Sequence, residues 1–129
     1  MKKTILICVA LLLLVSTVFI IGRGSACAAG DQDMGFPMYP GAKPDPANPA
    51  VNAPHIKNVH IFSSDPFEKV VAWYSEKLGK FDIDRQAKGA QALWYKETED
   101  GFFMNVTIST LTAPPGQVEI TLNKMKALK

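Results

Sequence analysis

The chain has 129 residues, a formal net charge of +2 and two cysteines. This length fits one domain and excludes a multi-domain enzyme or a long repeat array. Two cysteines exclude a disulfide-stapled mini-protein and a four-cysteine zinc site.

The pattern of charged, apolar and small residues in residues 1–28 predicts an export signal. Lys2 and Lys3 precede an apolar run without charge, residues 4–21, as a basic and then a hydrophobic region do in signal peptides. Small residues follow, and Ala26-Cys27-Ala28 fits the A-x-A pattern of a signal peptidase site. We therefore predict cleavage between Ala28 and Ala29, with the export machinery as the partner of residues 1–28.

Two alternatives to cleavage stay open. The apolar run reaches the lower length limit for a bilayer span, so residues 1–28 could remain as a membrane anchor. Ser25-Ala26-Cys27 also resembles the end of a lipoprotein signal, which makes Cys27 a candidate for lipidation, although Gly24 stands where that pattern has Leu. All three alternatives predict an extracytoplasmic domain, periplasmic or secreted.

The positive net charge of the chain comes from residues 1–28. Residues 1–28 carry three of the 14 basic residues and none of the 12 acidic ones, so the remainder has 11 basic and 12 acidic residues and a net charge of −1. Its basic residues are dispersed among acids, so no nucleic-acid partner is predicted. Both cysteines, Cys8 and Cys27, lie in the segment as well.

Residues 29–54 predict a proline-rich arm. Six prolines lie between Pro37 and Pro54, and proline excludes a regular helix or a central strand. Apolar residues at the start of the arm, Phe36 among them, are too many for a plain spacer, so we expect the arm to dock onto the domain. Tyr39-Pro40-Gly41-Ala42 predicts a tight turn in which Gly41 takes a positive φ.

Residues 55–129 predict a small α+β domain that begins with a strand over residues 56–63. A helix follows, for which Asp65 is the expected N-cap, Pro66 the first residue and Glu68 the partner in a capping box. An apolar stripe at helical spacing is expected to face the core, and it consists of Phe67, Val70, Val71, Tyr74 and Leu78. Gly79 is expected to end the helix.

Further strands are predicted after the helix. Phe81 and Ile83 alternate with Asp82 and Asp84, and segments 92–97, 102–109 and 118–123 follow. Asp100-Gly101 predicts a two-residue hairpin turn, which would pair Tyr95 with Val106 and place Trp94 and Phe103 on the face away from the helix. The fold class is thus α+β: a two-layer domain with one helix on an antiparallel sheet of four to five strands, in the order strand-helix-strand-strand-strand-strand.

Two passages carry a resemblance, Pro37 to Ala42 and Ser63 to Tyr74. Together they resemble a loose group of small bacterial exported proteins in which a Tyr-Pro-Gly-Ala turn precedes a strand, a capped helix and antiparallel strands. The resemblance implies an exported α+β domain and no catalytic residue. The element order also looks like that of cystatin-like folds, but the glycine-rich inhibitory hairpin of cystatins is absent, so protease inhibition is not implied.

No catalytic, cofactor or metal site is predicted. His55 and His60 are five residues apart and would point to opposite faces of a strand. Ser63 or Ser64, His60 and Asp65 could form a triad, but a helix cap explains the serines and the aspartate. Asp82 and Asp84 share a strand face without a predicted cleft. Packing explains the methionines better than a Cu(I) site does.

Aromatic residues form the candidate interaction patch: Trp94, Phe103 and Trp73. Large apolar groups on an open sheet face can mark a binding surface, unless the arm covers them. The sequence favours a non-enzymatic cell-envelope domain that binds a protein or a small apolar ligand. A small enzyme or ligand-pocket protein with a site between helix and sheet, and a purely structural anchored domain, remain alternatives.

Overall fold

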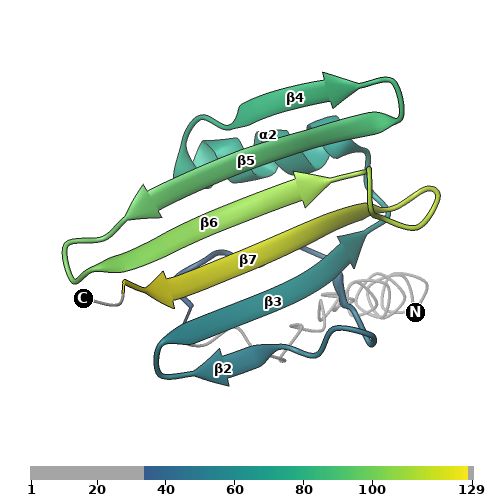
Figure 1. Ribbon diagram of the computed structural model, residues 1–129. Helices are drawn as coiled ribbons and strands as arrows, with labels where there is room; N and C mark the ends of the chain where they lie inside the picture. The colour runs from purple at the N-terminus through teal and green to yellow at the C-terminus, as the bar shows by residue number, and fades with distance from the viewer. Residues whose placement is uncertain (1–33, 128–129) are drawn as a thin grey trace, which may run out of the picture.

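The computed structural model describes residues 34–127 and contains one helix packed against one sheet (Figure 1). The elements are, in chain order, β1 (Lys43–Pro44), β2 (Val51–Ala53), β3 (Ile56–Ser63), α2 (Phe67–Leu78), β4 (Asp82–Gln86), β5 (Gly89–Glu97), β6 (Phe102–Ser109) and β7 (Val118–Lys126). The predicted α+β class is confirmed, as is the element order from β3 onward. The sheet has seven strands rather than four or five, because the arm adds β1 and β2.

All neighbouring strands of the sheet are antiparallel, in the order β1-β3-β7-β6-β5-β4, and β2 also pairs with β3. The chain passes from β3 through α2 to β4, which is the strand at the opposite edge of the sheet. The helix therefore crosses one face of the sheet (Figure 1). Pro44 lies in the outermost strand β1, where the missing N–H of proline costs no ladder hydrogen bond.

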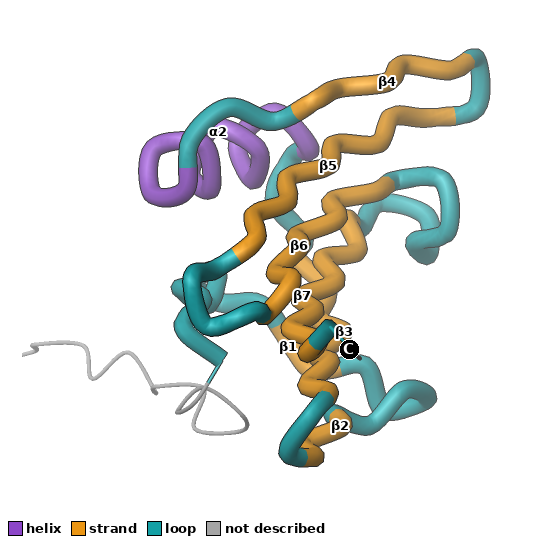
Figure 2. Tube along the Cα trace, turned by 60° about the vertical axis from the view of Figure 1, so that its left-hand side comes forward, coloured by secondary structure: helices purple, strands orange, loops and turns teal. Residues whose placement is uncertain are grey.

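The arm completes the second layer of the domain. Helix α2 contacts β5 and β6, and the arm runs along the same side of the sheet (Figure 2). Met34, Phe36 and Tyr39 are buried, and the Phe36 ring meets that of Trp94 edge-on, with 6.3 Å between ring centroids. The predicted docking of the arm is confirmed, and the arm belongs to the hydrophobic core.

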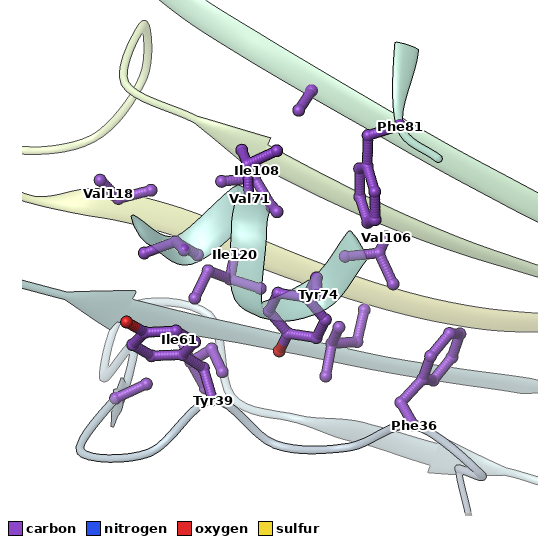
Figure 3. Close-up of a cluster of buried hydrophobic side chains, with 14 of the residues drawn as sticks. Phe36, Tyr39, Ile61, Val71, Tyr74, Phe81, Val106, Ile108, Val118 and Ile120 are labelled. Carbon is purple, nitrogen blue, oxygen red and sulfur yellow. The ribbon is translucent and has the colours of Figure 1, made fainter. Parts of the chain in front are cut away.

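The core fills the space between α2, the arm and the sheet (Figure 3). Val70 and Tyr74 of the helix have no exposed surface, and neither do residues from four of the strands: Ile61, Ala92, Val106, Ile108, Ile120 and Leu122. Four positions of the predicted helix stripe are buried, and Leu78 packs against the core at its edge. Burial of this apolar surface is the main source of stability for so small a domain.

The turn in the arm forms as predicted. The Ala42 N–H donates a 3.2 Å hydrogen bond to the Tyr39 carbonyl, and Gly41 has a φ of 73°. Proline at the second and glycine at the third position are typical of a type II turn, which requires a positive φ at the third residue. The turn positions Tyr39 for its contacts with the helix.

The predicted capping box at the start of α2 is wrong. The helix starts at Phe67, Pro66 is the N-cap residue, and no side chain caps the helix. The Asp65 carboxylate instead accepts hydrogen bonds from the Tyr39 hydroxyl at 2.7 Å and the Lys69 ammonium at 3.0 Å. Glu68 pairs with Arg85 of β4 at 2.7 Å. Other side chains therefore occupy both carboxylates that a capping box would use: Tyr39 and Lys69 bind Asp65, and Arg85 binds Glu68.

The predicted register of the β5–β6 hairpin is wrong by one residue. Trp94, not Tyr95, pairs with Val106, and Ala92 accordingly pairs with Ile108. The Thr98 N–H donates to the Phe102 carbonyl at 2.8 Å, which leaves a three-residue loop whose last residue, Gly101, has a φ of 79°. A type I turn followed by a left-handed glycine is the usual form of such a loop. The shift turns every β5 side chain to the other face of the sheet.

Candidate functional site

The sheet face opposite α2 and the arm faces the viewer in Figure 1, and we call it the outer face. Residues with odd numbers in β5, β6 and β7 and with even numbers in β3 point to it, as the register shows. No described element covers it. On these four strands its apolar and amide residues are Ile56, Asn58, Phe62, Gln91, Leu93, Tyr95, Phe103, Asn105, Asn123 and Met125.

One end of the outer face is apolar. Ile56, Met125 and Phe103 pair side by side across β3, β7 and β6, and each keeps 42–46% of its surface exposed. They line an open hollow of about 500 Å³ together with His55, Lys126 and Ala127. Exposed apolar residues that gather in one place, unlike scattered ones, are typical of interaction surfaces.

The middle of the outer face is polar. Asn58, Asn123 and Asn105 form one hydrogen-bonded row across β3, β7 and β6. In the next row His60 Nδ1 lies 3.2 Å from both Glu119 Oε1 and Thr121 Oγ1. The asparagine row was not predicted from the sequence, because only the strand register brings these distant residues together. One sequence feature could have indicated it: each of the three strands carries an asparagine, a residue that strands disfavour.

The three residues of the predicted patch do not come together. Phe103 lies on the outer face, as predicted. Trp94 lies on the opposite face and packs against the core next to Phe36. Trp73 also lies on the helix side, where its ring meets Tyr39 at 5.2 Å and carries the Lys77 ammonium 4.7 Å above it. The placement of Trp94 follows from the corrected register.

The structure also separates the residues of the candidate triad. His60 points to the outer face, whereas Ser63 is buried on the core side and accepts a hydrogen bond from the Asp65 N–H at 3.1 Å. Asp65 binds Tyr39 and Lys69. A nucleophile, a base and an orienting acid must lie in hydrogen-bond contact, and these three groups do not.

Asp82 and Asp84 share the outer side of β4, as their alternation predicts, and line an open hollow of about 280 Å³ with Ile83, Gln91 and Leu93. His60 lies four strands away, about 19 Å by the usual strand spacing. Among residues 34–127, no three His, Cys, Asp or Glu side chains are grouped so that they could hold a metal ion.

The methionines of the arm have packing roles. Met34 is buried in the core, and Met38 packs against it. Met104 likewise packs against the core from β6. Flexible thioether side chains fill irregular gaps of this kind.

The predicted processing site lies outside the described residues. Cys27, Ala28 and Ala29 belong to residues 1–33, so cleavage, lipidation and anchoring stay predictions. Within residues 34–127, no helix has the length and apolar character needed to cross a membrane.

Comparison with known proteins finds no relative. No family model matches the chain, and no curated protein or solved structure matches it significantly. The function must therefore be argued from the site itself.

Proposed function

We propose that the protein is a non-enzymatic, exported domain of a bacterial cell envelope that binds a protein or a small apolar ligand through the outer face of its sheet. The single observation that carries the proposal is that this face is uncovered by any described element while it bears Ile56, Phe103 and Met125 side by side. The export signal predicted for residues 1–28 supports the location.

The packing between helix and sheet supports a surface site rather than an interior one. Tyr74, Ile108 and Ile120 have no exposed surface, and they occupy the space in which a pocket between the two layers would have to lie (Figure 3). Binding sites for small molecules are usually concave and apolar, and the hollow beside Phe103 is of this kind.

Affinity capture from envelope extract tests the proposal with two matched variants. Phe103 and Ile83 are 42% and 45% exposed, but Ile83 pairs with Ala92, so its side chain points to the helix side. The hollow that Ile83 borders lies at the β4 edge of the sheet, two strands away from Phe103. We expect Phe103→Ser to lose a partner that wild type and Ile83→Ser both retain, and the purified partner to rebind wild type. Equal capture by all three proteins would contradict the proposal.

A further inference from the structure

The asparagine row on the outer face is a continuous hydrogen-bonded array. The Asn58 Nδ2 group donates to Asn123 Oδ1, and the Asn123 Nδ2 group donates to Asn105 Oδ1 at 3.0 Å. The three residues are direct neighbours across β3, β7 and β6. Asparagine is depleted in strands, so three of them in one row on an uncovered face are not explained by the needs of the sheet.

The row retains hydrogen-bonding capacity of both kinds. Each primary amide offers two N–H donors and an oxygen with two lone pairs. In the side-chain hydrogen bonds among residues 34–127, Asn105 takes part only through Oδ1 and Asn58 only through Nδ2, which leaves Asn105 Nδ2 and Asn58 Oδ1 for other partners. All three side chains are partly exposed, so these groups are open to a ligand. The internal bonds fix the amide planes and reduce the entropy lost on binding.

The charge of the surface selects the ligand. On the outer face of β3, β5, β6 and β7 the charged positions are Glu97 and Glu119, and the titratable His60 lies beside Glu119. Glu119 is occupied by His60 at 3.2 Å and by the Thr112 hydroxyl at 2.5 Å. Anionic ligands are recognised by Arg or Lys, and neither residue type stands at an outward position of these strands. Lys126 borders the hollow beside Phe103, but its ammonium lies over the Phe102 ring on the helix side. The outer face therefore disfavours an anionic ligand, and its amide row favours an uncharged one rich in hydroxyl or amide groups.

Aromatic rings flank the row. Tyr95 pairs with Asn105 and so continues the row onto β5, with 72% of its surface exposed, and Phe103 is 42% exposed in the adjoining row. Aromatic faces provide rigid contact area for the apolar side of a ligand. From Tyr95 to Asn58 the row spans three strand spacings, about 14 Å.

We infer that the row Tyr95–Asn105–Asn123–Asn58 binds an uncharged, β-linked polysaccharide chain laid across the strands. The pyranose rings of such a chain have apolar faces that stack on aromatic rings and equatorial hydroxyls that pair with amides. A β-1,4-linked chain is extended and flat and can follow a straight row, whereas an α-1,4-linked chain curls away from it. The inference rests on the outer face being the binding surface, as proposed above.

Titration of the ¹⁵N-labelled protein with cellotetraose and with chitotetraose tests the inference, with maltotetraose as the α-linked control. We expect shifts in the side-chain amide signals of Asn58, Asn105 and Asn123 with a β-linked sugar and weaker shifts with maltotetraose. Asn123→Ala should lower the affinity at least tenfold. Asn52→Ala should leave it unchanged, because Asn52 pairs with Lys57 on the other side of the sheet. Tyr95→Ala should also lower it, and its exposed position leaves the fold intact.

Absence of shifts with both β-linked sugars would overturn the inference, as would equal affinity of Asn123→Ala, Tyr95→Ala and wild type. Shifts of the same amides on self-association, without sugar, would assign the row to a second copy instead. The sugar titration could fail while affinity capture still yields a partner that depends on Phe103. This result would overturn the inference of a polysaccharide ligand and leave the proposed binding function standing.

Discussion

The hydroxyl of Tyr39 donates a 2.7 Å hydrogen bond to the Asp65 carboxylate, 26 residues further along the chain. Tyr39 belongs to the turn of the arm, and Asp65 lies just before the start of α2. The bond therefore joins the arm to the segment that leads into the helix. Burial of Tyr39, with 5% of its surface exposed, and the Asp65 carboxylate raise the pKa of this hydroxyl to about 12, so it remains a donor at neutral pH.

Substitution of Tyr39 by Phe should lower the free energy of unfolding by about 1 kcal/mol, because it removes one hydrogen bond to a charged acceptor and keeps the ring. Urea denaturation followed by circular dichroism measures this change. Tyr95→Phe is the matched control, since Tyr95 is 72% exposed, and it should leave the stability unchanged. Equal stability of Tyr39→Phe and wild type would show that the bond does not hold the arm.

Acid should weaken the same contact. The Tyr39 hydroxyl, followed by the Lys69 ammonium, holds the pKa of the Asp65 carboxyl below its usual range. A depressed pKa in the folded state contributes stability that is complete above the unfolded pKa, about 3.9, and is lost as pH falls through the lower folded value. The stability difference between wild type and Tyr39→Phe should thus be constant from pH 7 to 5 and shrink below about pH 4. Thermal unfolding along this series would show the shrinkage, and a difference that grows in acid would contradict it.

The elements that the sequence predicted depend on neighbours along the chain. The helix stripe from Phe67 to Leu78 and the turn at Gly41 follow from spacing and from backbone preferences within a few residues. Strands β1 and β2 were not predicted, because they have two and three residues and exist only by pairing with β3. The capping box failed for the same reason, since Asp65 binds a tyrosine that lies far away in sequence.

The hairpin register could not be fixed from the pattern of β5. This strand has apolar residues on both faces, with Ala92 and Trp94 on one and Leu93 and Tyr95 on the other, so alternation supports either orientation. The loop length decides between them, and Asp-Gly occurs in loops of two and of three residues. The asparagine row depends on register too, because its bonds join residues 65 and 18 positions apart.

Removal of the Tyr74 hydroxyl should cost no stability. This hydroxyl is buried, and although the Tyr39 backbone lies close to it, the two form no well-aligned hydrogen bond among residues 34–127. Burial raises its pKa above the usual range. An unpaired buried polar group carries a desolvation penalty of about 1–3 kcal/mol. Tyr74→Phe should therefore match or exceed the stability of wild type in urea denaturation, in contrast to Tyr39→Phe. A loss of more than about 1 kcal/mol would reveal a partner for this hydroxyl.

Truncation of two phenylalanines on opposite faces of the sheet should change the stability of the domain by very different amounts. Phe36 of the arm is 4% exposed and meets Trp94, whereas Phe103 on the outer face is 42% exposed. Phe36→Ala leaves a cavity in the core and should cost about 3–5 kcal/mol, as such core truncations do. That loss is a large part of the stability of a small domain. Phe103→Ala should change stability by about 0.5 kcal/mol at most, because its ring fills no cavity. Urea denaturation of both variants measures the free energy of unfolding and shows whether the arm belongs to the core. A large loss of stability in Phe36→Ala alone would identify the arm as a structural layer of the domain. Equally small losses in both variants would identify it as a tether.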